Sequence, residues 1–472
     1  MARINSNVGA VIAQRQLGGS YRSLNNTLSK LSTGLRINRG KDDPAGLIIS
    51  ERLRAEIGAV NQAIRNTQRA SNIIATTEGA LDEVANLLRD IQGLVIEAAN
   101  EGALSEEEIA ANQLQIDSAI ESITRISNST TFGGKQLLNG SLDYITSGVT
   151  TSQLASVQIR GAQFGTRTSI PVEIDVTQSA LPARLTYPLS NTGAGTVTIE
   201  VQGNDGVTTL SFASNTPVST VVEAINSVSD STGVRATQSG AAFYVESVGL
   251  GSRQFVSIKA LTGNFVVEDT GGNPSVRQVG RDARATLNGA LTTGDGNRLT
   301  LKTSTLDIEV RLDDNFGTGT TTFDITDGGA LFQVGPQVNT NLQVGLGVQS
   351  VAASRLGNAE VGFLSQIQTG QSFSLSSGNF LDAQKVLEDA IKQVAVMRGR
   401  LGAFEKNSLD TNVSQLSITM ENLTSSESAI RDADFAAETS QLARNQVLVS
   451  SGTTVLGIAN QTPASVLQLL GG

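Results

Sequence analysis

The chain has 472 residues and a formal net charge of −10, from 34 basic and 44 acidic side chains. This acidic balance argues against a general nucleic-acid binder. The chain has neither Cys nor His, which excludes a Ser-His-Asp triad, a cysteine nucleophile and a histidine-ligated zinc, so we expect no enzyme, cofactor or metal site.

The start of the chain is basic and carries a regular apolar pattern. Residues 1–41 contain seven Arg or Lys and no acid; the first acid is Asp42. A transit peptide has a similar composition, but a cleaved address does not need a heptad pattern. The pattern runs at alternate steps of four and three through Leu17, Tyr21, Leu24, Leu28, Leu31 and Leu35. It predicts a helix with one apolar stripe.

A second long helix is expected after "GKDDPAG" (40–46), where Pro44 would fix a bend between two helical segments. Its stripe continues to about residue 98, with weaker positions at Thr67, Ser71, Glu78 and Ala85. The stronger positions are Leu53, Ile57, Val60, Ile64, Ile74, Leu81 and Leu88. In "EGALSEEE" (101–108), Ser105 and Glu108 form a capping box that begins the next helix.

The middle of the chain changes to the alternation of strands. "TVTIEVQGNDGVTTLSF" (196–212) predicts a hairpin, and "LTLKTSTLDIEVRL" (299–312) alternates again. Between them, "TVVEAINSV" (220–228) predicts a short helix capped by Thr220 and Glu223. We therefore expect residues 181–327 to form a mostly β domain inserted into a helical protein.

Heptad spacing returns near the end of the chain and favours coiled-coil packing, although an ordinary helical bundle gives the same pattern over shorter runs. Its positions are Leu387, Ile391, Val394, Leu401, Leu409, Val413, Leu416, Met420, Leu423 and Ile430. Residues 445–472 then lack any charged side chain. Their stripe consists of Leu442, Val449, Leu456 and Leu470, with Asn445, Gly452, Ala459 and Val466 between them.

Packing the two ends of the chain together would bury one stripe of each. Several apolar residues lie off this seam and would still face water: Val447, Leu448, Val455, Ile458, Leu467 and Leu469. Neighbouring copies would cover them, and a contact between unlike patches whose rotation does not close makes a helical filament. A membrane-surface helix is the alternative, but such helices carry Lys or Arg on their polar face, which 445–472 lacks.

Two stretches resemble the terminal signatures of bacterial flagellin. They are "LSKLSTGLRINRGKDDPAGLIISERLRAEI" (28–57) and "SAIRDADFAAETSQLARNQVLVSSGTTVLGIANQTPASVLQLL" (428–470), and the resemblance covers about 1–140 and 345–472. The region 224–258 is similar to the insert motif of flagellins and hook-associated proteins. This chain departs from the family at Pro44, where flagellins commonly have Ala.

The resemblance implies an α+β fold in which paired terminal helices line the inner tube of a hollow filament. A coiled-coil domain with a β-hairpin lies outside them, and a variable β domain is at the surface. Mapped here, the domains are 1–42 with 432–472, 43–180 with 328–431, and 181–327. The expected polymer-interface residues are Leu24, Leu28, Leu31, Leu35, Leu442, Val449, Leu456, Val466 and Leu470, and the expected inter-domain bend is Asp42, Asp43 and Pro44.

The resemblance also implies a secreted, extracellular filament subunit, exported through the flagellar type III channel and used for swimming. Its partners would be further copies of itself, the filament cap, the hook-filament junction proteins and an export chaperone at the C-terminal helix, with no nucleic acid or membrane. A hook-filament junction protein is the nearest alternative function. An enzymatic outer domain is an alternative from another class, and the Ser/Thr-rich loops are candidate O-glycan acceptors.

An innate-immune receptor reads an Arg and a Leu on the first long helix of flagellins and a Glu on the next. The corresponding residues here are Asp90, with Arg89 beside it, Leu94 and Gln115. An acid in place of the base reverses the local charge, which weighs against recognition of this chain.

Overall fold

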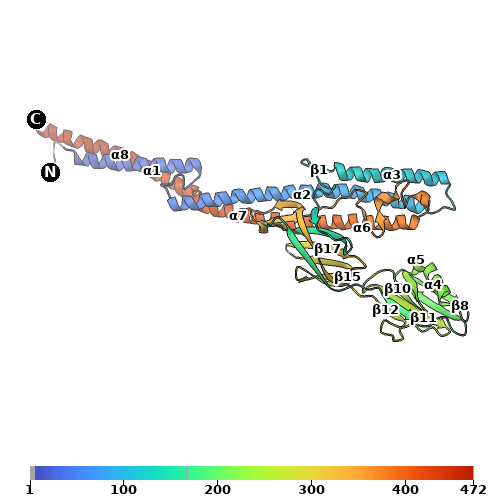
Figure 1. The fold of residues 1–472 in the computed structure, drawn as a ribbon. Helices are drawn as coiled ribbons and strands as arrows, with labels where there is room; N and C mark the ends of the chain where they lie inside the picture. The colour runs from blue at the N-terminus through green and yellow to red at the C-terminus, as the bar shows by residue number, and fades with distance from the viewer. Residues whose placement is uncertain (1–5, 166, 304, 471–472) are drawn as a thin grey trace. The chain divides into compact units, whose positions relative to one another are not determined.

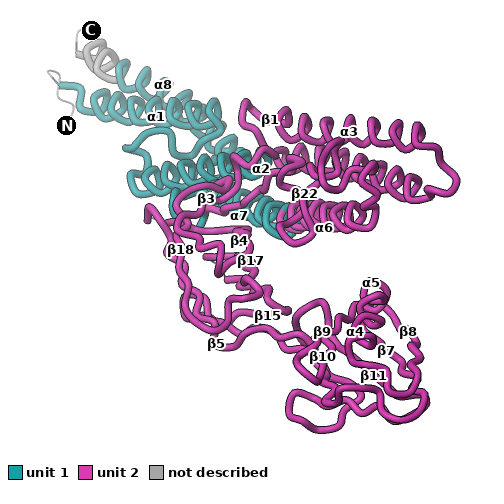
Figure 2. The backbone as a smooth tube through the Cα atoms, turned by 45° about the vertical axis from the view of Figure 1, so that its right-hand side comes forward, with its two compact units in different colours: residues 1–71, 333–342, 405–472 teal, residues 72–332, 343–404 magenta. Residues whose placement is uncertain are grey.

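In a computed structural model, residues 6–165, 167–303 and 305–470 are described, and of residues 462–470 only the backbone. The chain divides into two compact units (Figure 2), one of residues 1–71, 333–342 and 405–472 and the other of residues 72–332 and 343–404. This division does not test the three predicted domains, whose boundaries stay a prediction.

Long helices lie at both ends of the chain and strands fill the middle (Figure 1), which confirms the α+β fold. The helices are α1 (Val8–Thr33), α2 (Pro44–Ala98), α3 (Glu106–Ser129), α4 (Val218–Ser227), α5 (Ser229–Thr232), α6 (Phe380–Phe404), α7 (Thr411–Arg431) and α8 (Phe435–Leu470). In the described part of the chain, no helix is long and apolar enough to cross a membrane.

Helix α2 has a heptad stripe whose buried positions recur at steps of three and four. They are Val60, Ala63, Thr67, Ala70, Ile74, Thr77, Leu81, Val84, Leu88, Ile91, Val95 and Ala98. Every seventh residue from 60 to 88 is buried as the sequence predicted, but the alternate positions were predicted one residue too late. Thr77 and Val84 are buried, whereas Glu78 and Ala85 are only half-buried. Thr77 is tolerated because its hydroxyl donates to a carbonyl one turn earlier, at 2.8 Å.

Local features mark the start of α3 and the junction between α6 and α7. The Ser105–Glu108 capping box is present at the start of α3, as predicted. Helices α6 and α7 are joined by a π-helical segment, Glu405–Asp410. Two buried side chains, Leu401 of α6 and Leu409 of this segment, are eight residues apart, where a heptad would have seven.

One β module of the second unit is built from a five-stranded sheet (β14-β13-β5-β18-β3) and a four-stranded sheet (β15-β16-β17-β4) that share a core. Their strands are β3 (Tyr144–Ser147), β4 (Leu154–Ala162), β5 (Ile170–Gln178), β13 (Arg284–Leu287), β14 (Ala290–Leu291), β15 (Thr293–Asp295), β16 (Arg298–Lys302), β17 (Leu306–Leu312) and β18 (Gly319–Gly328). Strands from before residue 181 thus share a core with strands that follow residue 283.

A second β module has its own core and consists of a three-stranded sheet (β6-β10-β9) and a four-stranded sheet (β12-β11-β7-β8), with α4 packed into that core. The strands are β6 (Arg184–Tyr187), β7 (Val197–Gln202), β8 (Val207–Phe212), β9 (Val234–Ser239), β10 (Ala242–Ser247), β11 (Phe255–Thr262) and β12 (Arg277–Val279). The predicted hairpin is confirmed, because β7 and β8 pair antiparallel around the turn at 203–206.

The capping box predicted for α4 is wrong. The helix begins two residues before Thr220, at Val218, and no side chain caps it. Pro217 stands at the cap position, with an extended backbone that leads directly into the helix. The remaining short strands are β1 (Thr131–Phe132), β2 (Lys135–Gln136), β19 (Ala330–Gln333), β20 (Gln343–Leu346), β21 (Gly357–Asn358) and β22 (Gly362–Phe363).

Candidate assembly interface

The two ends of the chain pair as antiparallel helices, α1 and α8, within the first unit (Figure 1). The face that α8 turns toward α1 follows the predicted stripe: Leu442, Asn445, Val449, Gly452, Leu456 and Ala459 are buried or half-buried. The face of α1 is Ala10, Ala13, Leu17, Ser20, Leu24, Thr27 and Leu31. Tyr21 and Leu28, which the sequence pattern included, are exposed instead.

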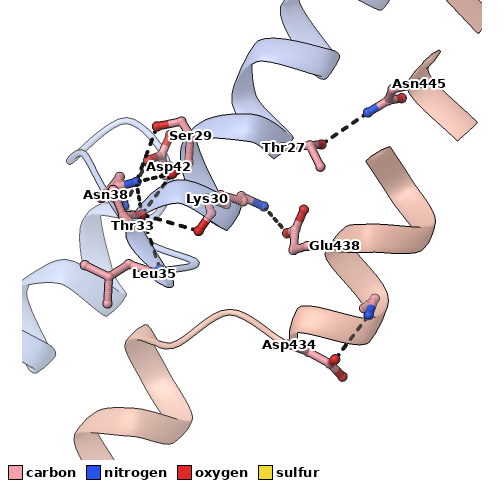
Figure 3. Close-up of polar contacts among 11 residues, drawn as sticks. Thr27, Ser29, Lys30, Thr33, Leu35, Asn38, Asp42, Asp434, Glu438 and Asn445 are labelled. Atoms are coloured by element: carbon pink, nitrogen blue, oxygen red, sulfur yellow. Dashed lines mark hydrogen bonds and ion pairs between the residues drawn. The ribbon is translucent and has the colours of Figure 1, made fainter. Parts of the chain in front are cut away.

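Three polar contacts tie the two helices together at separate points along the seam. The Asn445 amide donates to the Thr27 hydroxyl at 3.2 Å, and the Lys30 ammonium pairs with Glu438 at 2.8 Å (Figure 3). At the far end, the Asn7 amide donates to a carbonyl of α8 at 2.7 Å. Buried polar partners favour one register because any shift leaves them unpaired.

The helices come into close contact where Gly452 faces Leu17. A Cβ atom added at residue 452 would lie 3.0 Å from Leu17 Cδ1 and 3.8 Å from its Cα. At Gly457, one turn later, an added Cβ meets nothing within 4 Å. Gly452 therefore leaves room for the partner helix, whereas no contact in the structure requires a glycine at residue 457.

The predicted bend after α1 is held by two aspartates with different roles. Helix α1 ends at Gly34, whose φ of 72° suits a residue without a side chain. The Asp42 carboxylate accepts from the backbone N–H groups of Arg39 (2.9 Å) and Asn38 (3.2 Å), and these bonds lower its pKa. Asp42 therefore shapes the turn itself.

Asp43 caps the next helix. Its carboxylate accepts from the Gly46 N–H at 2.9 Å, and Pro44 occupies the first helical position, where no N–H is needed. An added Cβ at Gly46 would lie 2.4 Å from the Asp43 carboxylate and 2.7 Å from buried Ile37. In the motif "DDPAG", Asp42 therefore shapes the turn and Asp43 caps the helix. Pro44 begins the helix, and Gly46 lies where only glycine has room.

The chain bends a second time between α7 and α8, beside the first bend. Leu35 and Asp432 form an antiparallel bridge, and the Arg36 N–H donates to the Arg431 carbonyl at 2.6 Å. Asp434 then caps α8 by accepting from Ala436 N–H and a second N–H of the first turn (Figure 3). Both long helical segments therefore turn at one place, each with an aspartate cap.

An ion pair connects α2 and α7 close to the two bends. Arg431 donates to Glu51 at 2.7 Å, and this hydrogen bond lowers the pKa of the Glu51 carboxyl. On the other side of the bend, the bases of the acid-free start gather around a recess of about 840 Å³. Bases outnumber acids in its lining, which includes Arg22, Lys30, Arg36, Arg39 and Lys41 against Asp42 and Asp43.

The outer faces of the helix pair remain apolar and open to solvent. On α8, the exposed fraction is 64% for Val447 and 54% for Val455, and Leu448 and Ile458 are exposed as well. On α1, Val8, Val11, Ile12 and Leu28 are exposed. Of the expected polymer-interface residues, Leu24, Leu31, Leu35, Leu442, Val449 and Leu456 are half-buried within the unit, and the side chains of Val466 and Leu470 lie outside the described residues.

The receptor-related positions lie on helices of the second unit. Arg89, Asp90 and Gln115 are exposed and Leu94 is half-buried. The Arg89 guanidinium is held on its own helix by Asn86, at 2.6 Å. These contacts do not test recognition, which stays a prediction.

Two terminal helices that pair and leave an apolar face exposed, in a chain with a large β insert, define a self-assembling structural protein. Among the described residues, no group of three or more His, Cys, Asp or Glu side chains could hold a metal ion. Family models for the bacterial flagellin N-terminal and C-terminal helical regions match residues 4–143 and 384–470. A model for the flagellin hook IN motif matches 196–241, earlier than the expected 224–258.

Full-length relatives agree. The chain is 30% identical to B-type flagellin of Pseudomonas aeruginosa and 30% identical to flagellin of Salmonella rubislaw, in both cases over 99% of each chain. A solved structure of FliC from Burkholderia pseudomallei matches at 15% identity over 72% of this chain and 99% of that chain, with a TM-score of 0.25, which is too distant to add to the sequence match. The chain belongs to the bacterial flagellin family.

Family membership confirms the main functional predictions. The protein is a structural, non-enzymatic subunit of the extracellular filament of the bacterial flagellum, and it polymerises with itself.

Proposed function

We propose that the α1–α8 pair carries the polymer interface of this flagellin and that its two faces act differently. The seam holds the ends of one subunit together. The exposed apolar residues of α8, with Leu28 and its exposed neighbours on α1, contact adjacent copies in the filament.

The observation that carries this proposal is the row of large apolar side chains that the subunit leaves in water. Val447, Leu448 and Val455 are 45–64% exposed on a helix whose last part has no charge. Fully burying a side chain of this size stabilises an assembly by about 1.5–3 kcal/mol. Exposed rows of this kind mark interaction surfaces, and many identical subunits would repeat the gain along the filament.

We also propose the three-domain division, with 1–42 and 432–472 innermost, 43–180 and 328–431 next, and 181–327 outermost. The bridge between Leu35 and Asp432 supports the first boundary, since both chain segments bend there. The inferred bend residues Asp42, Asp43 and Pro44 form the turn and the cap at this position.

The proposed partners beyond other copies are the filament cap, the hook-filament junction proteins and an export chaperone. The resemblance of both terminal signatures supports the first two. The exposed apolar face of α8 supports the chaperone, because an uncovered face of this kind promotes aggregation before assembly.

Assembly of purified Val455→Asp tests the interface. A charge at this exposed position leaves the subunit fold intact but must be desolvated in a packed interface, so we expect filament growth to stop. Val455→Ile is the matched control because it keeps the apolar surface. Electron microscopy and sedimentation measure filament length and yield.

Unchanged monomer unfolding in both variants is required for a clear result. Normal filaments from Val455→Asp would show that this face is not the interface. Deletion of 445–472 is the coarser test: we expect the remaining helices and β modules to keep their thermal transition while polymerisation is lost.

A further inference from the structure

A polar cavity of about 130 Å³ lies in the second unit, between the outer face of one sheet and helix α6. The alternation of β17 explains the polar face. Ile308 and Val310 point into the β core, so Glu309 and Arg311 point away from it, toward the cavity. Arg160 of β4 lines the same cavity.

Positive charge exceeds negative charge around this cavity. Five bases line it: Arg160, Arg298, Arg311, Lys392 and Arg400. The acids in the lining are Glu309 and Asp389. Arg298 and Arg311 are cross-strand partners, and each already has a carboxylate partner, Glu309 for Arg298 and Glu360 for Arg311.

The acids of the lining are already engaged. Glu309 pairs with Arg160 and, at 3.2 Å, with Arg298. Asp389 accepts from two neutral amides, those of Asn358 and Gln393, both at 2.8 Å. Neither carboxylate therefore forms an ion pair with the bases contributed by α6.

Arg400 and Lys392 are those bases. Arg400 donates to the backbone carbonyl of Arg160 at 3.3 Å, and neither it nor Lys392 forms an ion pair with any described carboxylate. Burial and the nearby Arg160 lower the pKa of Arg400. Asp307 and Asp143 attract it from outside the cavity lining, as does Glu309 within the lining, and burial raises the pKa of Asp143.

We propose that this cavity binds a small, doubly charged oxyanion of the phosphate or sulfate class. A planar guanidinium offers paired donors that match such an anion, and the ammonium of Lys392 adds a further donor. The cavity has room for more than one water molecule, which the anion would displace. The bound anion would join α6 to the sheet by contacting bases from both.

Equilibrium dialysis of the full-length monomer against radiolabelled inorganic phosphate, at constant ionic strength, tests the proposal. We expect one saturable site with a Kd of about 1 mM or tighter, as two or three charge-assisted hydrogen bonds would give. Sulfate should compete, whereas chloride and acetate should not.

The variants locate the site. Arg400→Gln and Lys392→Gln should each weaken binding by about tenfold or more. Arg253→Gln, which removes an exposed base outside the cavity, should leave it unchanged. If Arg400→Gln disturbs the thermal transition, Lys392→Gln carries the test, because that side chain is exposed.

Three results would overturn the proposal. They are the absence of saturable phosphate binding, equal binding by all variants, and equal competition by acetate. The last would indicate a site for a carboxylate, such as an acidic side chain of another copy.

Discussion

Asn445 and Thr27 share a buried hydrogen bond of 3.2 Å in the seam between the two ends of the chain. Only 2% of Asn445 and 5% of Thr27 is exposed, so water does not compete for either group. Leucines and valines flank this pair in the stripe of α8. A polar pair among apolar positions weakens the seam slightly but penalises every shifted register.

We expect Asn445→Ala to lower the temperature at which filaments dissociate. The substitution removes the amide and opens a small void, so the seam should lose about 1–3 kcal/mol per subunit. Asn460→Ala, on an exposed position of the same helix, is the control. Equal dissociation temperatures for the two variants would contradict a role of the buried pair.

The close approach of Leu17 to Gly452 predicts a different kind of failure. Gly452→Val should push the helices apart and destabilise their pairing by about 1–3 kcal/mol, because the added methyl groups meet Leu17 directly. Gly457→Val has open space and should be neutral or stabilising, since glycine is a poor helix former. Hydrogen exchange of α1 amides in the monomer measures both effects. Faster exchange in Gly457→Val as well would indicate a general helix effect.

The cap of α2 should tolerate one substitution and not another. Asp43→Ala removes the acceptor for the Gly46 N–H and should cost about 0.5–2 kcal/mol of unfolding free energy. Asp43→Asn keeps an equivalent acceptor and should restore most of the stability. Thermal unfolding followed by circular dichroism measures the three proteins. A loss of the same size in both variants would point to the charge of Asp43 and not to its cap.

The Glu51–Arg431 pair predicts a small stability change in acid. Arg431 lowers the folded-state pKa of Glu51 below the ordinary 4.5, so its contribution is complete above that value and is lost as the pH falls through the lowered pKa. Because Glu51 is exposed, we expect a small effect on unfolding. NMR titration of the Glu51 carboxyl in the wild type and in Arg431→Met measures the shift directly. The same pKa in both proteins would exclude the pair as its cause.

Much of this architecture could be predicted from the sequence, and the errors in helix register have one physical cause. Helix stripes were predicted from large apolar residues, which identified Leu17 and Leu24 in α1 and every seventh residue of α2. The alternate positions hold Ser20, Thr27 and Thr77, which the pattern passed over. Small hydroxyl residues can be buried when a nearby oxygen satisfies them, as with Thr77, which donates to a carbonyl one turn earlier at 2.8 Å.

An apolar pattern along the sequence cannot predict features that depend on contacts between distant parts of the chain. The need for glycine at residue 452 depends on Leu17, which lies over 400 positions away in the chain. The cationic cavity depends on strand register and on α6 meeting the sheet, and no local motif specifies either. In contrast, the turn and cap at "DDPAG" are local, because Asp42 and Asp43 accept from backbone N–H groups no more than four residues away.

The corrected register of α2 gives the last prediction. Val84 is fully buried and Glu78, a position of the predicted stripe, is only half-buried. Val84→Ala should therefore lower the unfolding free energy by about 2 kcal/mol through the cavity that it leaves. Glu78→Ala should change it by less than about 0.5 kcal/mol, since it removes no core volume and alanine favours the helix. Urea unfolding of the monomer separates the two registers: a larger loss for Glu78→Ala than for Val84→Ala would restore the register that the sequence pattern indicated.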